Sequence, residues 1–254
     1  MIKSLRNLGI LTNRDWAVTI SIIIAAIAII TAKIPVKSKE ISVVEKAEKP
    51  VKKQKTFSVS EKKKRFKEII LRPTRKVFLK LQRSYQDVRL QIRKNPDSKY
   101  LKNLREKYQV QNNQELLEVL KPHPISLTLA QAAMESAWGT SRFFNQANNV
   151  FGIWSFDENE PRIAAKGKRK GETIWVRKYD SIEDSIEHYY YTLAVGQPYA
   201  KFRKVKMLTN DSLRLALELD GYSEKGAEYG KELNAIIKYN NFQNFDEKPD
   251  PTYK

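Results

Sequence analysis

Cysteine is absent from this 254-residue sequence, and histidine occurs only as His123 and His188. The lack of cysteine excludes disulfide bonds, thiolate zinc sites and thiol nucleophiles. The two histidines have no recognisable ligand spacing, so nothing in the sequence supports a metal site. We expect neither a metal nor a cofactor.

Acidic residues are scarce relative to basic ones: 29 Asp and Glu against 47 Lys and Arg, for a formal net charge of +18. The excess is local, because residues 33–107 hold 25 basic and 8 acidic residues, whereas residues 108–254 hold 19 and 20. The positive charge therefore belongs to residues 33–107, a basic stalk that precedes a nearly neutral C-terminal part. Such a stalk can bind acidic lipid head groups or wall polymers as well as phosphates. A nucleic-acid or anionic-membrane binder is the least favoured hypothesis, and we expect no specific nucleic-acid partner.

Long hydrophobic runs are also rare. The longest uncharged run, residues 16–32 (WAVTISIIIAAIAIITA), follows a short N-terminal segment, residues 1–15. Its length predicts a transmembrane anchor at the short end of the usual range. A cleavable signal peptide is the alternative, because Ala26 and Ala28 form a small-x-small pair. We favour the anchor, since the apolar run continues past that pair.

The rest of the chain predicts mostly helices. Residues 33–60 have no apolar period and are typical of a flexible basic linker. Residues 61–110 have hydrophobic residues at helical spacing and predict a basic helical pre-domain, in which Pro73 marks a kink or a break. A C-terminal domain over residues 111–246 and a tail over residues 247–254 complete the expected organisation.

The C-terminal domain predicts an α+β fold that is mainly α. A buried central helix, ISLTLAQAAMESAWG, ends near Gly139. VFGIWSF (150–156) and TIWVRKY (173–179) predict the two strands of a hairpin, with a polar loop over 157–172. Two capping boxes, Asn112 with Glu115 and Ser181 with Asp184, each predict the start of a further helix. Two more helices are expected near the C-terminus, at residues 211–219 and 224–239.

Glu135 combines a carboxyl group with surroundings that favour its protonated form. It lies in the last turn of the apolar helix, where burial by Ala132, Met134 and Trp138 disfavours the anion, as does the negative end of the helix dipole. Cleavage of a glycosidic bond needs such an acid, because the leaving sugar oxygen must receive a proton. On the residues alone, a carboxylate in a salt bridge or in solvent is the more common interpretation.

The segment LAQAAMESAWGTSRF, followed by NNVFGIWSF, closely resembles the cell-wall glucosaminidases of glycoside hydrolase family 73, which include Bax-type proteins. The resemblance runs over about 190 residues, from near residue 61 to residue 246. It implies a lysozyme-like fold, in which a mostly helical lobe and a small β-hairpin lobe flank a substrate groove. It also implies that the glutamate of ESAWG, Glu135, is the catalytic acid.

One segment departs from the family pattern. Before the Pro-Tyr pair the family has Asn-Thr-His, whereas this chain has Ala194, Val195 and Gly196. A substrate contact that the Asn-Thr-His segment makes in the family is therefore not expected to carry over directly to this chain.

Six further residues are candidates for contact with the glycan. The amides of Asn148 and Asn149 follow the central helix, where they either bind sugar hydroxyls and N-acetyl groups or serve a local turn. Flat faces for sugar rings come from four aromatic residues, although most such residues in proteins belong to the core; these are Trp138, Trp154, Tyr179 and Tyr189. By family position we favour Tyr179 and Tyr189 for the groove.

The second catalytic group has no single candidate. Five carboxylates lie on or beside the predicted hairpin and none stands out: Asp157, Glu158, Glu160, Glu172 and Asp180. A mechanism assisted by the acetamido group of the substrate needs no second carboxylate, so the stereochemistry stays open.

The favoured function is a monomeric peptidoglycan hydrolase that cleaves β-1,4 glycosidic bonds of cell-wall glycan strands, as an N-acetylglucosaminidase rather than a muramidase. The alternative is a catalytically impaired wall-binding or scaffolding protein on the same fold. If the wall is the substrate, we expect a single-pass protein of the bacterial inner membrane, with the catalytic domain on the periplasmic or extracytoplasmic side.

Overall fold

The computed structural model describes residues 57–169 and 171–246. The predicted transmembrane anchor and the predicted tail lie outside the described residues, as does nearly all of the predicted linker. Among the residues that are described, no helix is long and apolar enough to cross a membrane. The anchor stays a prediction.

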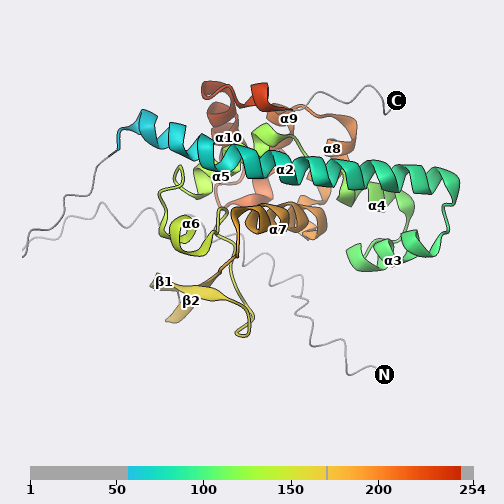
Figure 1. The fold of residues 1–254 in the computed structure, drawn as a ribbon, viewed down its shortest axis with the longest axis horizontal. Coiled ribbons are helices and arrows are strands. Elements are labelled where there is room, and N and C mark those ends of the chain that lie inside the picture. The colour runs from blue at the N-terminus through green and yellow to red at the C-terminus, as the bar shows by residue number, and fades with distance from the viewer. Residues whose placement is uncertain (1–56, 170, 247–254) are drawn as a thin grey trace, which may run out of the picture.

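A 36-residue helix, α2 (Val59–Lys94), runs along one side of the molecule (Figure 1). It begins at a capping box between Ser58 and Glu61. Of the two alternatives predicted at Pro73, a kink or a break, the break is wrong, because the helix continues through this residue. Ile70, Thr74 and Val77 are buried on both sides of Pro73, and this packing holds the backbone helical where the missing N–H would otherwise weaken it.

Two short helices, α3 (Lys99–Tyr108) and α4 (Asn113–Leu120), follow at the far end of α2. Their apolar side chains form a small cluster around Val88, Leu101 and Leu116. The capping box predicted for α4 is confirmed at its main contact, because the Asn112 side chain accepts a hydrogen bond from the Glu115 backbone N–H at 2.8 Å.

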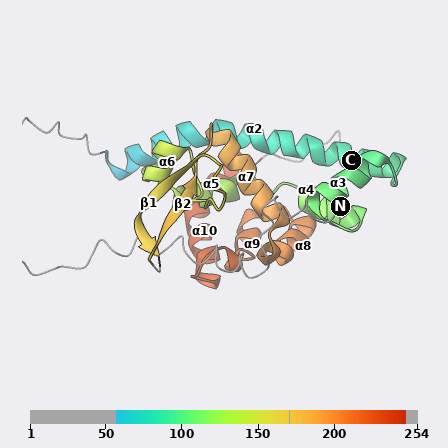
Figure 2. The same ribbon diagram turned by 90° about the horizontal axis from the view of Figure 1, so that it is seen from below.

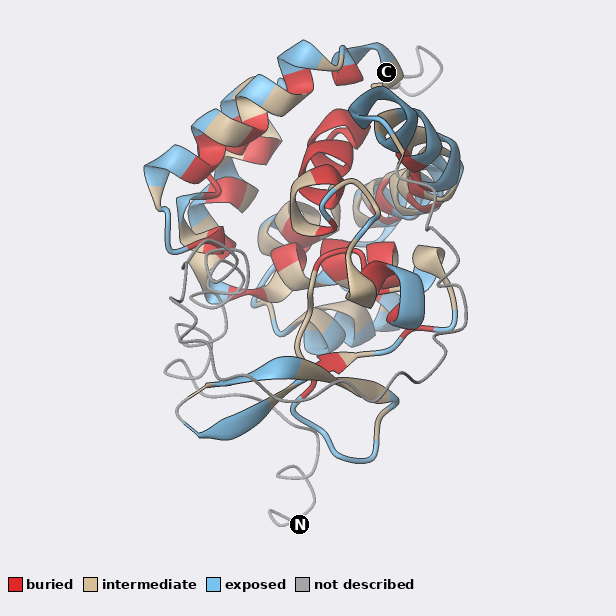
Figure 3. Ribbon diagram, turned by 90° about the vertical axis from the view of Figure 1, so that its left-hand side faces the viewer, coloured by how far each residue is buried: buried red, intermediate tan, exposed pale blue. Residues whose placement is uncertain are grey.

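The centre of the fold is α5 (Ile125–Glu135), in which every residue from Ile125 to Ala133 is buried. It contacts α2 and three elements from the C-terminal part of the chain, which are α9 (Ser212–Ala216), α10 (Ala227–Tyr239) and the 3₁₀ turn η5 (Phe242–Phe245). In Figure 3 the buried residues gather in these central helices. The prediction of a buried central helix is therefore confirmed.

The N-terminus of α5 is capped from a distant part of the chain. Pro124 provides no side-chain cap, but the Asp246 carboxylate accepts hydrogen bonds from the backbone N–H and the hydroxyl of Ser126, both at 2.7 Å. A carboxylate at this end of a helix also complements the helix dipole. The C-terminal end of the domain thus stabilises its central helix.

The remaining helices pack on the elements named above, on one another or on the hairpin. They are α6 (Arg142–Ala147), α7 (Ile182–Val195) and α8 (Ala200–Leu208), with 3₁₀ turns η3 (Gln197–Tyr199) and η4 (Asp220–Tyr222). The Ser181–Asp184 capping box that opens α7 is confirmed. Lys76 and Lys80 of α2 form ion pairs with two glutamates of α7 at 3.0 and 2.7 Å, so α2 and α7 lie side by side.

The hairpin consists of β1 (Arg162–Arg169) and β2 (Glu172–Arg177), which pair antiparallel beyond α6 (Figures 1 and 2). The sequence placed the first strand at 150–156, and this is wrong. Val150 and Phe151 are instead buried in the helical core, which leaves only a single bridge, from Trp154 to Val176, along the outer edge of β2. All of β1 lies within residues 157–172, the segment predicted as a polar loop.

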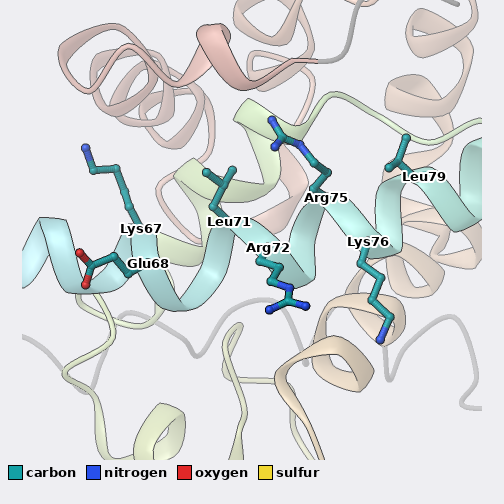
Figure 4. Close-up of a pocket in the computed structure, with 7 residues that line it drawn as sticks. All are labelled: Lys67, Glu68, Leu71, Arg72, Arg75, Lys76 and Leu79. Carbon is teal, nitrogen blue, oxygen red and sulfur yellow. The ribbon is translucent and has the colours of Figure 1, made fainter.

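An open groove runs along α2, lined by residues of that helix alone among the part of the chain that the structure describes (Figure 4). Leu71 and Leu79 lie on one side of it together with Lys67 and Arg75, and Glu68, Arg72 and Lys76 lie on the other side. None of the predicted site residues lies there. The groove is therefore separate from the region around Glu135.

Candidate active site

Glu135 is the last residue of α5, and the backbone turns sharply after it. Ala137, Trp138 and Gly139 all have positive φ angles, of 50°, 58° and 74°, a rare conformation for the two residues that carry a side chain. The Ser136 hydroxyl holds this turn, because it donates to the Ala132 carbonyl at 2.6 Å and accepts from the Gly139 N–H at 2.8 Å. The turn ends the helix so that Glu135 is only partly buried.

The Glu135 carboxyl group lies among tyrosines. The Tyr229 hydroxyl, from α10, donates a hydrogen bond to Glu135 Oε1 at 2.8 Å. Tyr189, Tyr199 and Tyr222 are also close enough for their ionisation to be opposed by the Glu135 charge. These rings come from α7, η3 and η4, so most of the surroundings of Glu135 arise from the second half of the chain.

Burial raises the pKa of Glu135 to about 7. The Tyr229 hydrogen bond and the charge of Lys225 act in the opposite direction, and Glu232 raises the pKa further. Lys225 and Glu232 pair with each other at 2.6 Å, so the net effect of their two charges is small. A carboxyl group with this pKa holds its proton in a large fraction of molecules near neutral pH, as a general acid must.

The structure places Trp138 on the side of the turn that faces α2 and η5. Its ring packs edge-on against Phe66 at 5.4 Å between centroids and lies 6.3 Å from Phe242. The Lys63 ammonium group sits over the same ring at 4.6 Å. These contacts join the end of α5 to α2, and a contact between Trp138 and substrate stays a prediction.

The two predicted asparagines hold the loop between α6 and the hairpin. Asn149 is 1% exposed, and its amide donates to the Ile153 and Arg177 carbonyls and accepts from the Ile153 N–H, all within 2.9 Å. Asn148 has a left-handed backbone, and its amide donates to the Tyr179 and Asp180 carbonyls. Both side chains therefore serve the turn, and contact with a sugar stays a prediction.

The three other predicted aromatic residues lie in different surroundings. Trp154 is partly exposed at the edge of β2 and lies near Phe156, at 6.0 Å between ring centroids. Tyr179 is 8% exposed, with its hydroxyl 2.6 Å from His188 Nδ1. Tyr189 is wrongly placed at the groove by the sequence, because it is fully buried and stacks on Phe151 at 3.9 Å.

The carboxylates considered for a second catalytic role differ in their partners. Glu160 forms an ion pair with Arg177, which also contacts His188. Asp157 accepts hydrogen bonds from the backbone and side chain of Asn159. Glu158, Glu172 and Asp180 are exposed. The geometry therefore singles out no second carboxylate.

Residues 110–242, just over half of the chain, match the family model described as mannosyl-glycoprotein endo-beta-N-acetylglucosaminidase. The chain belongs to the glucosaminidase family. The expected resemblance is confirmed, and the glucosaminidase domain carries Glu135, Tyr229 and the whole hairpin. The chain accordingly contains a glycoside hydrolase domain.

Within the glucosaminidase family, the chain is similar to Protein bax of Escherichia coli (strain K12), with 31% identity over 49% of this chain and 46% of the relative. It is 28% identical to Exo-glucosaminidase LytG of Bacillus subtilis (strain 168), over 48% and 46%. The chain thus spans about half the length of these relatives. The glycoside hydrolase domain from Salmonella typhimurium FlgJ aligns at 20% identity with a TM-score of 0.44, over 72% of this chain and 90% of that one.

Sequence reasoning missed two polar residues of the glucosaminidase domain, Tyr229 and Gln131. Gln131 precedes Glu135 by four residues and so lies on the same face of α5; a buried amide in an otherwise apolar helix was the available signal. Tyr229 lies 94 residues from Glu135 and had the appearance of an ordinary core aromatic. Only the packing of α10 against α5 brings it to the carboxyl group.

Proposed function

We propose that this protein is a peptidoglycan hydrolase that cleaves β-1,4 glycosidic bonds in cell-wall glycan strands, with Glu135 as the general acid. The observation that carries the proposal is the Glu135 carboxyl group, held by Tyr229 and with a pKa of about 7. Membership of the glucosaminidase family supports the substrate class. An exo-glucosaminidase among the relatives favours the N-acetylglucosaminidase specificity over muramidase.

In the proposed reaction Glu135 gives its proton to the glycosidic oxygen while the bond from that oxygen to the anomeric carbon breaks. Water then adds to the anomeric carbon and releases a proton, which restores the acid. Positive charge at the anomeric carbon is stabilised either by a carboxylate of the hairpin or by the acetamido group of the substrate. The ion pair of Glu160 with Arg177 makes Glu160 the less suitable of the hairpin carboxylates.

The test is the variant Glu135→Gln on purified peptidoglycan. We expect release of soluble fragments to fall by at least about a hundredfold while binding to sacculi persists, because general acid catalysis contributes about 10²–10⁴ in rate. Glu218→Gln is the matched control, since Glu218 is likewise a glutamate shielded from solvent but pairs with Lys201. Undiminished release by Glu135→Gln removes this residue from the mechanism.

Mass spectrometry of the released fragments identifies the bond. New reducing ends on N-acetylglucosamine support the proposed specificity, and new reducing ends on N-acetylmuramic acid assign a muramidase. Binding to sacculi with no fragments at any pH favours the alternative, a wall-binding or scaffolding protein on the same fold.

The proposed substrate also sets the proposed location. A domain that acts on the wall has to lie outside the cytoplasm, so we place it on the periplasmic or extracytoplasmic side, tethered by residues 16–32. Protease digestion of intact spheroplasts tests this arrangement: the domain is removed if it lies outside and is protected if it lies within the cytoplasm.

A further inference from the structure

A chain of buried hydrogen bonds leads from Glu135 into the core. Tyr229 receives a hydrogen bond from Gln131 Nε2 at 3.0 Å, and the Tyr189 hydroxyl donates to Gln131 Oε1. His123 Nε2 lies 3.2 Å from the Tyr189 hydroxyl and 3.0 Å from the Thr128 hydroxyl. His123, Gln131 and Tyr189 are each at most 1% exposed, so water does not compete for these bonds.

The direction of every proton in this chain follows from one carbonyl. The His123 backbone oxygen can only accept, so the Tyr190 hydroxyl donates to it, and Thr128 donates in turn to Tyr190. Thr128 then accepts from His123 Nε2, which must carry the ring hydrogen. Nε2 has one hydrogen, which Thr128 and Tyr189 share as acceptors, and the hydrogen of the Tyr189 hydroxyl points to Gln131 Oε1.

The same logic continues to the carboxyl group. With its oxygen held by Tyr189, the Gln131 amide presents its nitrogen to Tyr229. The lone pairs of Tyr229 face this donor, and its hydrogen points to Glu135 Oε1. Burial and the nearby Lys206 hold the pKa of His123 well below its ordinary range. The imidazole therefore stays neutral, and the direction of the chain is independent of pH near neutrality.

We propose that His123, Tyr189 and Gln131 are positioning residues: they direct the Tyr229 hydroxyl to Glu135 Oε1 and thereby leave Oε2 as the oxygen that carries the catalytic proton. This inference rests on the proposed function, in which Glu135 is the general acid, and it names the residues that orient the Glu135 carboxyl group. The Glu135 carboxyl group can rotate about its side-chain bonds. Its proton can reach the glycosidic oxygen in only some of the resulting orientations. A fixed donor to Oε1 selects one of them.

The test is the pKa of the Glu135 carboxyl group, measured by ¹³C NMR titration of the side chain and assigned with Glu135→Gln. In Tyr189→Phe the Gln131 oxygen loses its donor, the amide turns over, and the Tyr229 hydroxyl donates to Gln131 instead of Glu135. The anion loses a charge-assisted hydrogen bond, so its pKa rises by about one unit. The alkaline limb of kcat/KM moves upward by the same amount.

The double variant Tyr189→Phe/Gln131→Met separates this mechanism from a packing effect. Without the Gln131 amide, nothing diverts the Tyr229 hydroxyl, so the pKa of Glu135 returns to the value in Gln131→Met alone. Tyr199→Phe is the control, because Tyr199 is equally buried and close to Glu135 but makes none of the hydrogen bonds of the chain. We expect it to leave the pKa of Glu135 unchanged.

The other groups that face Glu135 are the same in every variant of this comparison: Lys225 and Glu232, which are charged, and the hydroxyl of Tyr222. An unchanged pKa in Tyr189→Phe overturns the inference, as does a shift that persists in the double variant or appears equally in Tyr199→Phe. The titration needs no substrate. If the wild type releases no fragments, the proposed function fails and the titration still decides the role of the chain.

Discussion

At the scale of single residues, the ionised form of Glu135 opposes folding. Its pKa is raised to about 7 by burial, whereas an unfolded chain has an ordinary glutamate. Between the two pKa values the folded state binds more protons than the unfolded state, so the free energy of unfolding decreases as pH rises through this range. Above pH 7 the folded protein contains a charged carboxylate that is only partly compensated.

This predicts that Glu135→Gln stabilises the protein while it removes activity. The gain in the free energy of unfolding reaches about 2 kcal/mol at pH 8, because the amide has no charge to bury. At pH 4.5 the gain is small, since wild-type Glu135 is then protonated in the folded state. Thermal unfolding at both pH values checks this, and an equal gain at the two would contradict it.

Lys206 is another buried ionisable residue whose charge opposes folding. Its side chain lies beside Phe202 and is 3% exposed. Burial, with Arg203 and Lys121 nearby, lowers its pKa to about 7, although Glu118 acts to raise it. Because the unfolded state binds more protons between pH 7 and about 10.5, stability from this group rises with pH over that range.

Lys206→Met is therefore expected to raise the free energy of unfolding at pH 7 by about 1–3 kcal/mol, since it removes a desolvated charge and retains the apolar stem. The same variant should flatten the increase in stability between pH 7 and pH 10. Urea unfolding at three pH values measures both effects. Loss of stability at pH 7 would show that the ammonium group makes a net favourable contribution.

At the scale of secondary structure, the elements around Glu135 owe their position to close helix contacts. A Cβ atom at Gly230 of α10 would lie 2.6 Å from the Ala216 carbonyl oxygen and 2.9 Å from Leu217 Cα. These are backbone atoms, which cannot rotate away. Glycine therefore lets α10 approach α9 closely enough to bring its neighbour, Tyr229, to the carboxyl group.

Gly230→Ala should move α10 away from α9 and weaken the Tyr229 hydrogen bond to Glu135. We expect a loss of about 1–3 kcal/mol in the free energy of unfolding, as overpacking typically costs, together with reduced kcat. Gly167→Ala in β1 is the control, because a Cβ there meets nothing within 4 Å. If Gly230→Ala retains full stability, α10 is not held by this contact.

The hairpin shows where local pattern misleads. Residues 150–156 have the apolar and aromatic composition of a strand, but Phe151 is needed in the core, where it stacks on Tyr189. Residues 162–169, half of which are basic, form the strand instead, because their backbone pairs with β2 although none of them is buried. Side-chain pattern predicts strands poorly in a two-stranded sheet with little buried area.

At the scale of the whole molecule, α2 belongs to the same core as the family-matched region. The family model begins at residue 110, yet Phe66, Ile70 and Val77 of α2 are at most 1% exposed and pack in one cluster with residues of α5, α7 and α10. Lys76 and Lys80 add ion pairs to α7, although such exposed pairs contribute little energy. The inner face of α2 is therefore part of the core that holds the domain together.

A fragment of residues 110–246 should consequently fail to fold, while residues 57–246 should fold on their own. Removing α2 removes the three buried apolar side chains named above and exposes part of α5. Burial of each such side chain contributes about 1.5–3 kcal/mol. The sum of the three contributions is comparable with the stability of a whole domain. Circular dichroism with thermal unfolding compares the two fragments. Cooperative unfolding of the shorter one would show that α2 is dispensable.

The sequence alone determined the mainly helical class and the buried central helix, because these depend on local composition and on spacing along one helix, and its resemblance to the glucosaminidases marked Glu135 as the candidate acid. Only the tertiary structure decided what holds the acid. Tyr229 lies 94 residues away and Tyr189 lies 58 residues from Gln131, and no local pattern encodes such pairs. Their hydrogen bonds exist because α7 and α10 pack on α5 and exclude water, which also raises the pKa of Glu135.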